Sequence, residues 1–196
     1  MVTYSIATTA LLVGTTAARV RRWSREPEGP CGGDVQNRDG VTTLGFRGLL
    51  EAAVASALAA QRLTAPELRI VVRAARDVFE DANPLATARF LVEGEDLVEA
   101  VLSGRRHIRP FGFGIVDHDR NGAPLRWWPR GREKGVVVDP DMCSGRAVEV
   151  DSFVPVRALA ASVDSEGSVE RAAASWEVDV ASVRRALDFR DLVGRI

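Results

Sequence analysis

The feature that most restricts the fold is the spacing of small and apolar residues near the start of the chain. Ala10 is followed after four positions by Gly14, and Val20 and Trp23 stand six and nine positions beyond that glycine. A small residue lets two helices approach, a glycine adopts the left-handed turn, and apolar residues at these offsets anchor the second helix. The spacing therefore predicts two short helices packed across a tight turn, with a threonine capping the second.

Burial of the apolar residues of the second helix would turn its arginines toward solvent. Arginine suits guanine edges and phosphates, and the amino end of such a helix usually enters the major groove. The pattern therefore predicts a helix-turn-helix that binds DNA. Its expected contact residues are Thr16, Ala17, Arg19, Arg21 and Arg22.

Composition offers a second interpretation of the same arginines. Of the 26 basic residues only Lys134 is a lysine, although the net charge is −1. A chain with this bias places arginine clusters on ordinary solvated helices. The apolar spacing does not follow from the bias, so it favours DNA binding. Trp23 is expected to be a core residue and not a base-stacking one.

Length and composition are typical of a soluble globular protein. The chain has 196 residues, 46% hydrophobic and 27% charged, enough for one sizeable core or two small ones. The longest apolar runs fall short of the roughly 18 residues that a membrane span needs, and the start lacks the pattern of a signal peptide. With two cysteines the chain is no disulfide scaffold, so we expect a cytoplasmic protein that does not bind membranes.

Periodicity predicts a mainly helical α+β fold in four blocks. These are a helix-turn-helix at 1–25, a linker or loop at 26–43, a middle region of helices and β-hairpins at 44–132, and a carboxyl-terminal domain at 133–196. The linker assignment rests on its glycines, prolines and scarcity of apolar residues. The last block is expected to be a three-helix, homeodomain-like domain entered through a short β-ribbon.

Within the middle region, the pattern predicts two helices followed by two hairpins. The helices cover 44–61 and 64–81, and the alanine-rich surface of the first is a candidate homodimer interface. One hairpin is expected around the Glu-Gly-Glu-Asp segment of "ARFLVEGEDLVEAVL". The other is expected around Asn121-Gly122, a strong turn signal.

Two segments resemble known bacterial families. "YSIATTALLVGTTAARVRRW" resembles the helix-turn-helix of MerR-like regulators. "VVVDPDMCSGRAVEV" and "VPVRALAASVDSEGSVERAAASWEVDVASVRRALDF" resemble a domain of unknown function, the DUF-four-three-three family, although Ala147 stands where proline is usual. Proteins with both parts resemble VapB-type antitoxins. The resemblance implies a protein that neutralises a PIN-like ribonuclease toxin and represses its own operon at operator DNA.

Two other functions remain open at this point. The chain could be a stand-alone MerR-like transcriptional regulator without a toxin, or an adaptor that does not bind DNA. The last two helices repeat the packing offsets at Ala173, Val178, Val183 and Ala186, but Glu177 replaces the glycine. Because the charges of the final helix nearly cancel, we expect that pair to serve protein contact or the core.

Chemical sites are not expected. His107, His118, Cys31 and Cys143 lack the close-spaced pairs of zinc sites, so we expect no metal, and no cofactor motif or catalytic constellation occurs. We therefore expect no enzyme, and Asp117, His118 and Asp119 fit polar turn positions.

The segment 105–134 carries eight basic residues against three acidic ones. It fits two interpretations equally well. One is a basic arm that contacts DNA or a partner. The other is a solvated β-ribbon with Trp127 or Trp128 buried.

Overall fold

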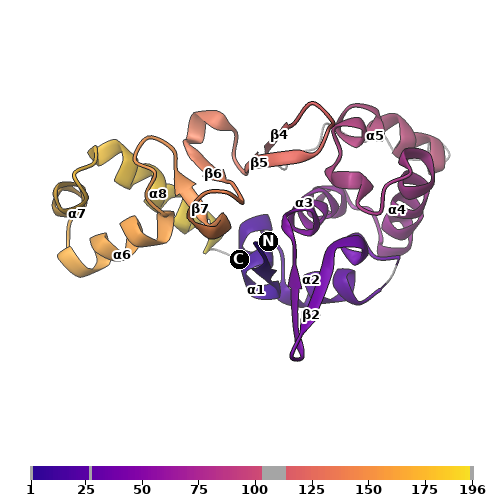
Figure 1. Ribbon diagram of the computed structural model, residues 1–196, viewed down its shortest axis with the longest axis horizontal. Coiled ribbons are helices and arrows are strands. Elements are labelled where there is room, and N and C mark those ends of the chain that lie inside the picture. Colours follow the sequence, from indigo (N-terminus) through magenta and orange to yellow (C-terminus); the bar gives the residue numbers. More distant parts are fainter. Residues whose placement is uncertain (1, 27, 103–113, 195–196) are drawn as a thin grey trace. The chain divides into compact units, whose positions relative to one another are not determined.

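The computed structural model describes residues 2–26, 28–102 and 114–194, and the chain is mainly helical with two small β-sheets. It divides into two compact units, which are described separately (Figure 1). The N-terminal unit comprises Met1–Phe113 with His118–Pro124, and the C-terminal unit comprises Gly114–Asp117 with Leu125–Ile196. The second unit therefore begins before residue 133, because the strand that follows Ala123 pairs within it.

The N-terminal unit combines five α-helices with a three-stranded sheet among the residues described. Its elements are β1 (Tyr4–Ser5), α1 (Ile6–Val13), α2 (Ala17–Arg25), β2 (Val35–Arg38), β3 (Val41–Leu44), α3 (Phe46–Ala60), α4 (Ala65–Phe79) and α5 (Ala88–Val101). Short 3₁₀ turns cover Gly32–Asp34 and Pro84–Ala86.

Residues 26–43, expected to form a linker or loop, contain most of a β-hairpin. The strands lie in the order β1-β3-β2 and are antiparallel, with Leu44 opposite both Tyr4 and Val35. Polar residues fill most of the remaining strand positions, so the segment lacks the alternating pattern that signals a strand. Figure 1 shows the hairpin extending beyond the helices of this unit.

Helix α3 forms the core of the N-terminal unit. Nine of its 15 residues are buried, and Leu49, Leu50, Val54 and Leu58 have no exposed surface. Its contacts are made with α1, α4 and the Pro84–Ala86 turn of the same unit. The homodimer interface predicted on 44–61 is therefore wrong, because the chain itself covers that surface.

The segment 88–102 is helix α5 and not the predicted hairpin. Thr87 caps the helix by accepting a hydrogen bond from Phe90 N at 3.2 Å. Gly94, expected at a turn, is buried in the helix, and a Cβ there would lie 3.0 Å from the Phe90 ring. The Phe90 ring packs edge-on against Phe79 of α4, with 6.1 Å between the ring centroids. This tertiary packing outweighs the low helix propensity of Gly94.

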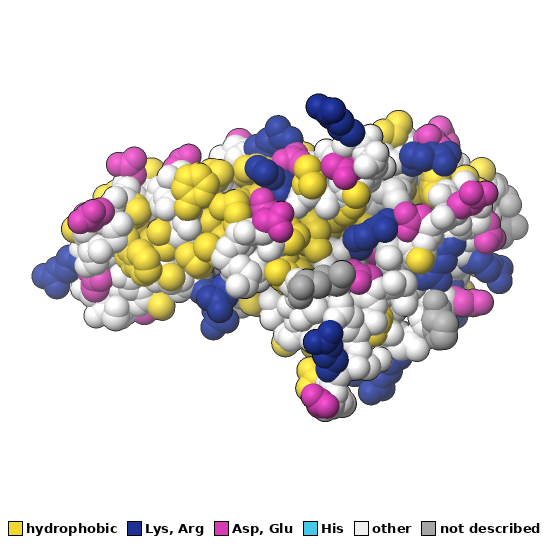
Figure 2. Space-filling model, in the orientation of Figure 1, with side chains coloured by type: hydrophobic (Ala, Val, Ile, Leu, Met, Phe, Trp, Pro, Cys, Tyr) yellow, Lys and Arg dark blue, Asp and Glu magenta, His cyan; other side chains and the backbone are white. Residues whose placement is uncertain are grey.

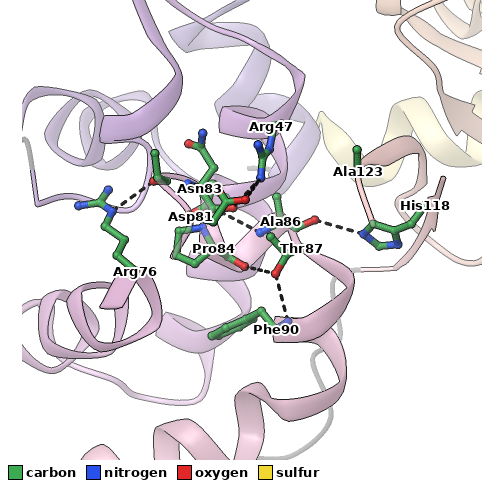
Figure 3. Close-up of polar contacts among 12 residues, drawn as sticks. Arg47, Arg76, Asp81, Asn83, Pro84, Ala86, Thr87, Phe90, His118 and Ala123 are labelled. Atoms are coloured by element: carbon green, nitrogen blue, oxygen red, sulfur yellow. Dashed lines mark hydrogen bonds and ion pairs between the residues drawn. The ribbon is translucent and has the colours of Figure 1, made fainter. Parts of the chain in front are cut away.

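A polar cluster joins α3 and α4 to the turn before α5 (Figure 3). Arg47 forms an ion pair with Asp81 at 2.6 Å and donates to Asn83 O at 3.4 Å. Glu51, fully buried, accepts from Ala86 N at 2.8 Å. His118 Nε2 lies 3.2 Å from Ala86 O, and because a carbonyl only accepts, the ring donates. Residues 81–87 are thus held from several sides, and no sequence motif signals this cluster.

Glu51 is the ionisable group of this cluster whose side chain has no exposed surface. Burial raises its pKa well above the usual value, against the opposing effects of the Ala86 hydrogen bond, Arg76 and Arg47. Its Oε2 has no hydrogen-bond partner among the described residues. A lone buried carboxylate oxygen is costly, so folding favours the protonated form of Glu51 over the ionised one.

The C-terminal unit pairs a four-stranded sheet with three helices. Among the described residues its elements are β4 (Ile115–His118), β5 (Pro124–Trp128), β6 (Val136–Val138), β7 (Ala147–Glu149), α6 (Val156–Glu166), α7 (Val169–Trp176) and α8 (Val180–Val193), although the end residues His118 and Pro124 of the first two strands belong to the N-terminal unit. The strands lie in the order β4-β5-β6-β7, and Trp128, Val137 and Val148 form a buried cluster. The predicted hairpin at Asn121-Gly122, the ribbon and the three helices are all present.

No helix in the described ranges combines the length and the apolar character that a bilayer span requires.

We predict that Glu51→Gln flattens the dependence of stability on pH. The folded state binds the Glu51 proton more tightly than the unfolded state, so the wild type loses stability as pH rises from the usual glutamate range toward neutrality. The glutamine cannot ionise and retains an acceptor for Ala86 N. Urea unfolding across this pH range measures the difference. Exposed Glu93→Gln serves as the control, and parallel curves for Glu51→Gln and wild type would contradict the prediction.

Candidate nucleic-acid interface

Helices α1 and α2 meet at a left-handed turn, as the spacing predicts. Gly14 has φ 68° and ψ 46°, and Thr15 N donates to Ala10 O at 3.0 Å. Thr16 caps α2, its Oγ1 accepting from Arg19 N at 3.2 Å. A residue with a Cβ is strained in this conformation, which explains why glycine occupies the turn.

The predicted packing residues of this pair are buried. Ala10 is 5% exposed, Val20 0% and Trp23 6%. Trp23 is therefore a core residue, as expected, and its ring is not available to stack on a base.

The candidate contact residues lie where the spacing predicts. Thr16, Arg19, Arg21 and Arg22 are exposed, and Ala17 is half-buried. Arg19 donates to Thr15 Oγ1 at 3.4 Å. Among the described residues no carboxylate pairs with Arg19, Arg21, Arg22 or Arg25. The exposed face of α2 thus carries positive charge that the described part of the unit leaves uncompensated.

The hairpin β2–β3 presents a second polar surface in the same unit. Asp39 and Gly40 both have positive φ, 51° and 77°, which produces a tight reversal at its tip. A pocket of about 250 Å³ lies against the sheet. The residues lining this pocket are Thr3, Gln36, Arg38, Val41 and Thr43. The glycines and prolines of this segment indicate a loop, so the sequence does not reveal the surface.

Helices α7 and α8 repeat the turn between α1 and α2. Val178 N donates to Ala173 O at 3.0 Å, as Thr15 N does to Ala10 O. Glu177 takes the left-handed position with φ 54°. Val183 and Ala186 are fully buried, in line with the predicted offsets. The backbone geometry alone therefore does not distinguish the two helix pairs.

The charges of α8 distinguish it from α2. Each of its three arginines contacts a carboxylate: Arg184 lies 3.8 Å from Glu170, Arg185 2.6 Å from Glu149, and Arg190 3.1 Å from Asp164. Arginines neutralised within the unit contribute little to phosphate binding. Val183 and Ala186 thus belong to the core, while a role of this pair in protein contact stays a prediction.

Glu149 anchors Arg185 in the C-terminal unit. Its side chain has no exposed surface and also accepts from Ser152 N at 2.9 Å. Burial alone would raise its pKa, but the hydrogen bonds from Ser152, Arg185 and Ser182 outweigh burial, so the pKa is lowered. Arg185 also pairs with Asp151.

The described part of the basic segment, 114–134, is an ordinary β-ribbon. Trp127 and Trp128 are 2% and 8% exposed, and Trp128 Nε1 donates to Asp117 at 3.0 Å. Arg132 pairs with the same carboxylate, and Arg126 lies 3.7 Å from it. The tryptophans are therefore structural, while residues 105–113 lie outside the described part of the chain.

The polar residues near the hairpin tip have structural roles. Asp119 Oδ1 accepts from Asn121 N and Ala123 N at 2.8 and 2.9 Å, as expected of a turn residue.

Cys31 is buried and Cys143 exposed, and both are free. In the ranges that the structure describes, His, Cys, Asp and Glu side chains form no group of three able to hold a metal ion.

We predict that Arg185→Ala lowers the free energy of unfolding by about 3 kcal/mol at neutral pH, because it leaves Glu149 buried without its cation. The lowered pKa means that this stabilisation is present above the usual glutamate pKa and is lost as pH falls, so the deficit should shrink in acid. Urea unfolding at neutral and at acidic pH measures the difference in the free energy of unfolding between variant and wild type. Arg184→Ala removes only an exposed pair and should cost less than about 0.5 kcal/mol. Equal losses for the two variants would disprove this role of Arg185.

Comparison with known proteins establishes the fold alone. No protein-family model and no curated protein matches the sequence. The fold is similar to that of Rv2018 from Mycobacterium tuberculosis, solved by X-ray crystallography, with a TM-score of 0.75. The alignment covers 94% of this chain and 97% of that chain at 16% identity. The arrangement of helices and sheets is thus shared over nearly the whole length.

Proposed function

We propose that the chain is the antitoxin of a type II toxin-antitoxin system and represses its own operon. In this proposal α1, the Gly14 turn and α2 form a helix-turn-helix of the MerR-like kind, and α2 enters the major groove of operator DNA. Thr16 and Ala17 approach base edges, while Arg19, Arg21 and Arg22 contact phosphates or guanines.

The observation that carries DNA binding is the contrast between α2 and α8. The two helices follow the same kind of turn, with buried Val20 and Val183 in equivalent places. On α8 each arginine has a carboxylate partner, whereas the described residues provide none for the arginines of α2. Affinity for DNA arises mainly from cations that displace counterions from phosphates. An arginine face without such partners, on a helix of this geometry, is what that interaction requires.

The β2–β3 hairpin is proposed to extend this interface. The hairpin offers Arg38 as a cation and Gln36 and Thr43 as polar contacts, and Thr3, just before β1, lines the same pocket. Contacts of this kind to phosphates fix the register of a protein on DNA without reading sequence. We assign positioning on the duplex to the hairpin and base contacts to α2.

Binding of the toxin is assigned to the C-terminal unit. This assignment follows the resemblance of its sequence to antitoxin domains. The face shown in Figure 2 gathers hydrophobic side chains over this unit. The unit also exposes three large hydrophobic side chains, Phe153, Trp176 and Leu192, which are 62%, 42% and 42% exposed. Exposed aromatic residues are common at the centres of protein interfaces. Masking a PIN-like ribonuclease needs no catalysis by this chain.

A homodimer suits a palindromic operator, and we propose one without assigning its surface.

We predict that Arg19→Ala, Arg21→Ala and Arg22→Ala together weaken binding to a duplex from the chain's own promoter. The slope of log K against log salt should fall by about 0.9 for each phosphate that the variant no longer neutralises. Fluorescence anisotropy over a salt series measures both quantities. Arg184→Ala on α8 is the matched control and should bind as the wild type does. An unchanged affinity and slope in the triple variant would exclude α2 as the DNA-binding helix.

We also predict a stable complex with a nuclease encoded beside this gene. Co-expression of the full chain should restore growth that the nuclease alone arrests, and the two proteins should co-purify. Phe153→Ala should weaken the complex, because it removes the most exposed aromatic side chain of the unit, whereas Val92→Ala in the other unit should not. DNA binding without growth rescue would favour a stand-alone MerR-like regulator.

A further inference from the structure

The carboxyl end of α2 lies against residues 28–34, the connector that leads to the β2–β3 hairpin. Gly29 N donates to Glu26 O at 2.8 Å. A Cβ on Gly29 would lie 2.3 Å from Trp23 O and 2.9 Å from Glu26 O, so the connector backbone directly abuts the last turn of α2. Movement of this connector would therefore move α2.

Two arginines of α4 contact the connector and the carboxyl-terminal cap of α2. Arg76 NH2 donates to Gly29 O at 2.9 Å, and its Nε donates to Ala82 O at 3.2 Å. Arg69 lies 3.3 Å from the carboxylate of Glu26, which is the carboxyl-terminal cap of α2. Since Arg69 and Arg76 are two helical turns apart, both contacts come from one face of α4.

We propose that Arg76, assisted by Arg69, is a positioning residue for DNA recognition by α2. The inference rests on the proposed function. Arg76 donates to carbonyls of two chain segments at once, which the planar fork of a guanidinium permits and a single ammonium group does poorly. Its cation also lies near the carboxyl end of α2, where positive charge is favourable. The pair links the orientation of α2 to the core of the N-terminal unit without touching DNA.

The consequence concerns specificity more than affinity. Hydrogen bonds to base edges need donor–acceptor distances near 2.7–3.2 Å, so a helix whose orientation is less defined forms fewer of them. Non-specific binding depends on charge alone and tolerates such movement. Loss of Arg76 should therefore reduce binding to the correct sequence and leave non-specific binding almost unchanged.

The test compares four full-length variants on two duplexes. The variants are Arg76→Ala, Arg76→Lys, Arg69→Ala and Arg73→Ala, the last being exposed on the same helix without an ion pair among described residues. The duplexes are the chain's own promoter and a scrambled sequence of equal length. Affinity and salt slope are measured for each, with circular dichroism and thermal unfolding to establish the fold.

We expect Arg76→Ala to lower the ratio of specific to non-specific affinity about tenfold, equivalent to about 1.4 kcal/mol. Arg76→Lys should recover part of the ratio, and Arg69→Ala should show a smaller decrease. Arg73→Ala should match the wild type. The salt slope on the scrambled duplex should be unchanged throughout, because no variant removes a phosphate contact.

An unchanged ratio in well-folded Arg76→Ala would overturn the inference, as would equal decreases in Arg73→Ala and Arg76→Ala. If Arg76→Ala fails to fold, Arg69→Ala decides, and a wild-type ratio in that variant overturns it. A wild type that does not prefer its promoter would overturn the proposed DNA recognition itself, and the inference with it.

Discussion

Burial of α3 on almost every side is the constraint on which the N-terminal unit depends. A buried helix must find partners for its polar groups inside the protein. The first turn of α3 meets this demand through Asp34, whose carboxylate accepts from Gly48 N at 2.8 Å, because the capping residue Gly45 has no side chain to do so. The side chains of Arg47 and Glu51 find their partners in residues 81–86: Arg47 pairs with Asp81, and Glu51 accepts from Ala86 N. The connector after α2 and the turn before α5 are thus fixed by the same helix.

The two helix pairs show that one backbone arrangement can serve different purposes. Both place an alanine, a left-handed residue and a buried valine at matching positions. What differs is where the carboxylates lie. Glu149 takes Arg185 out of the exposed face of α8, whereas the described residues of the N-terminal unit provide no such partner for α2. The difference is a property of side-chain charge, and it separates a candidate DNA-binding helix from a structural one.

Local patterns predicted much of this fold, and contacts distant in sequence account for the rest. The α1–α2 turn and the Asn121-Gly122 hairpin follow from short-range spacing. The β2–β3 hairpin and the helical conformation of 88–101 do not, because pairing with β1 and packing on Phe79 decide them. The exposure of Thr16, Arg19, Arg21 and Arg22 was predictable from sequence, whereas their contact with DNA stays a prediction. The contact of Arg76 with Gly29, 47 residues away, carries no sequence signal.

The arginines of α2, which have no carboxylate partner among the described residues, also affect the free protein. Arg19, Arg22 and Arg25 succeed one another at intervals of three, so their like charges are neighbours on one helix face. Each such pair opposes helix formation by about 0.2–0.5 kcal/mol at low salt. Dissolved salt screens this repulsion, and a bound polyanion would cancel it. The helix proposed to bind DNA is therefore held in shape against its own charge, and any phosphate-rich surface would relieve that opposition.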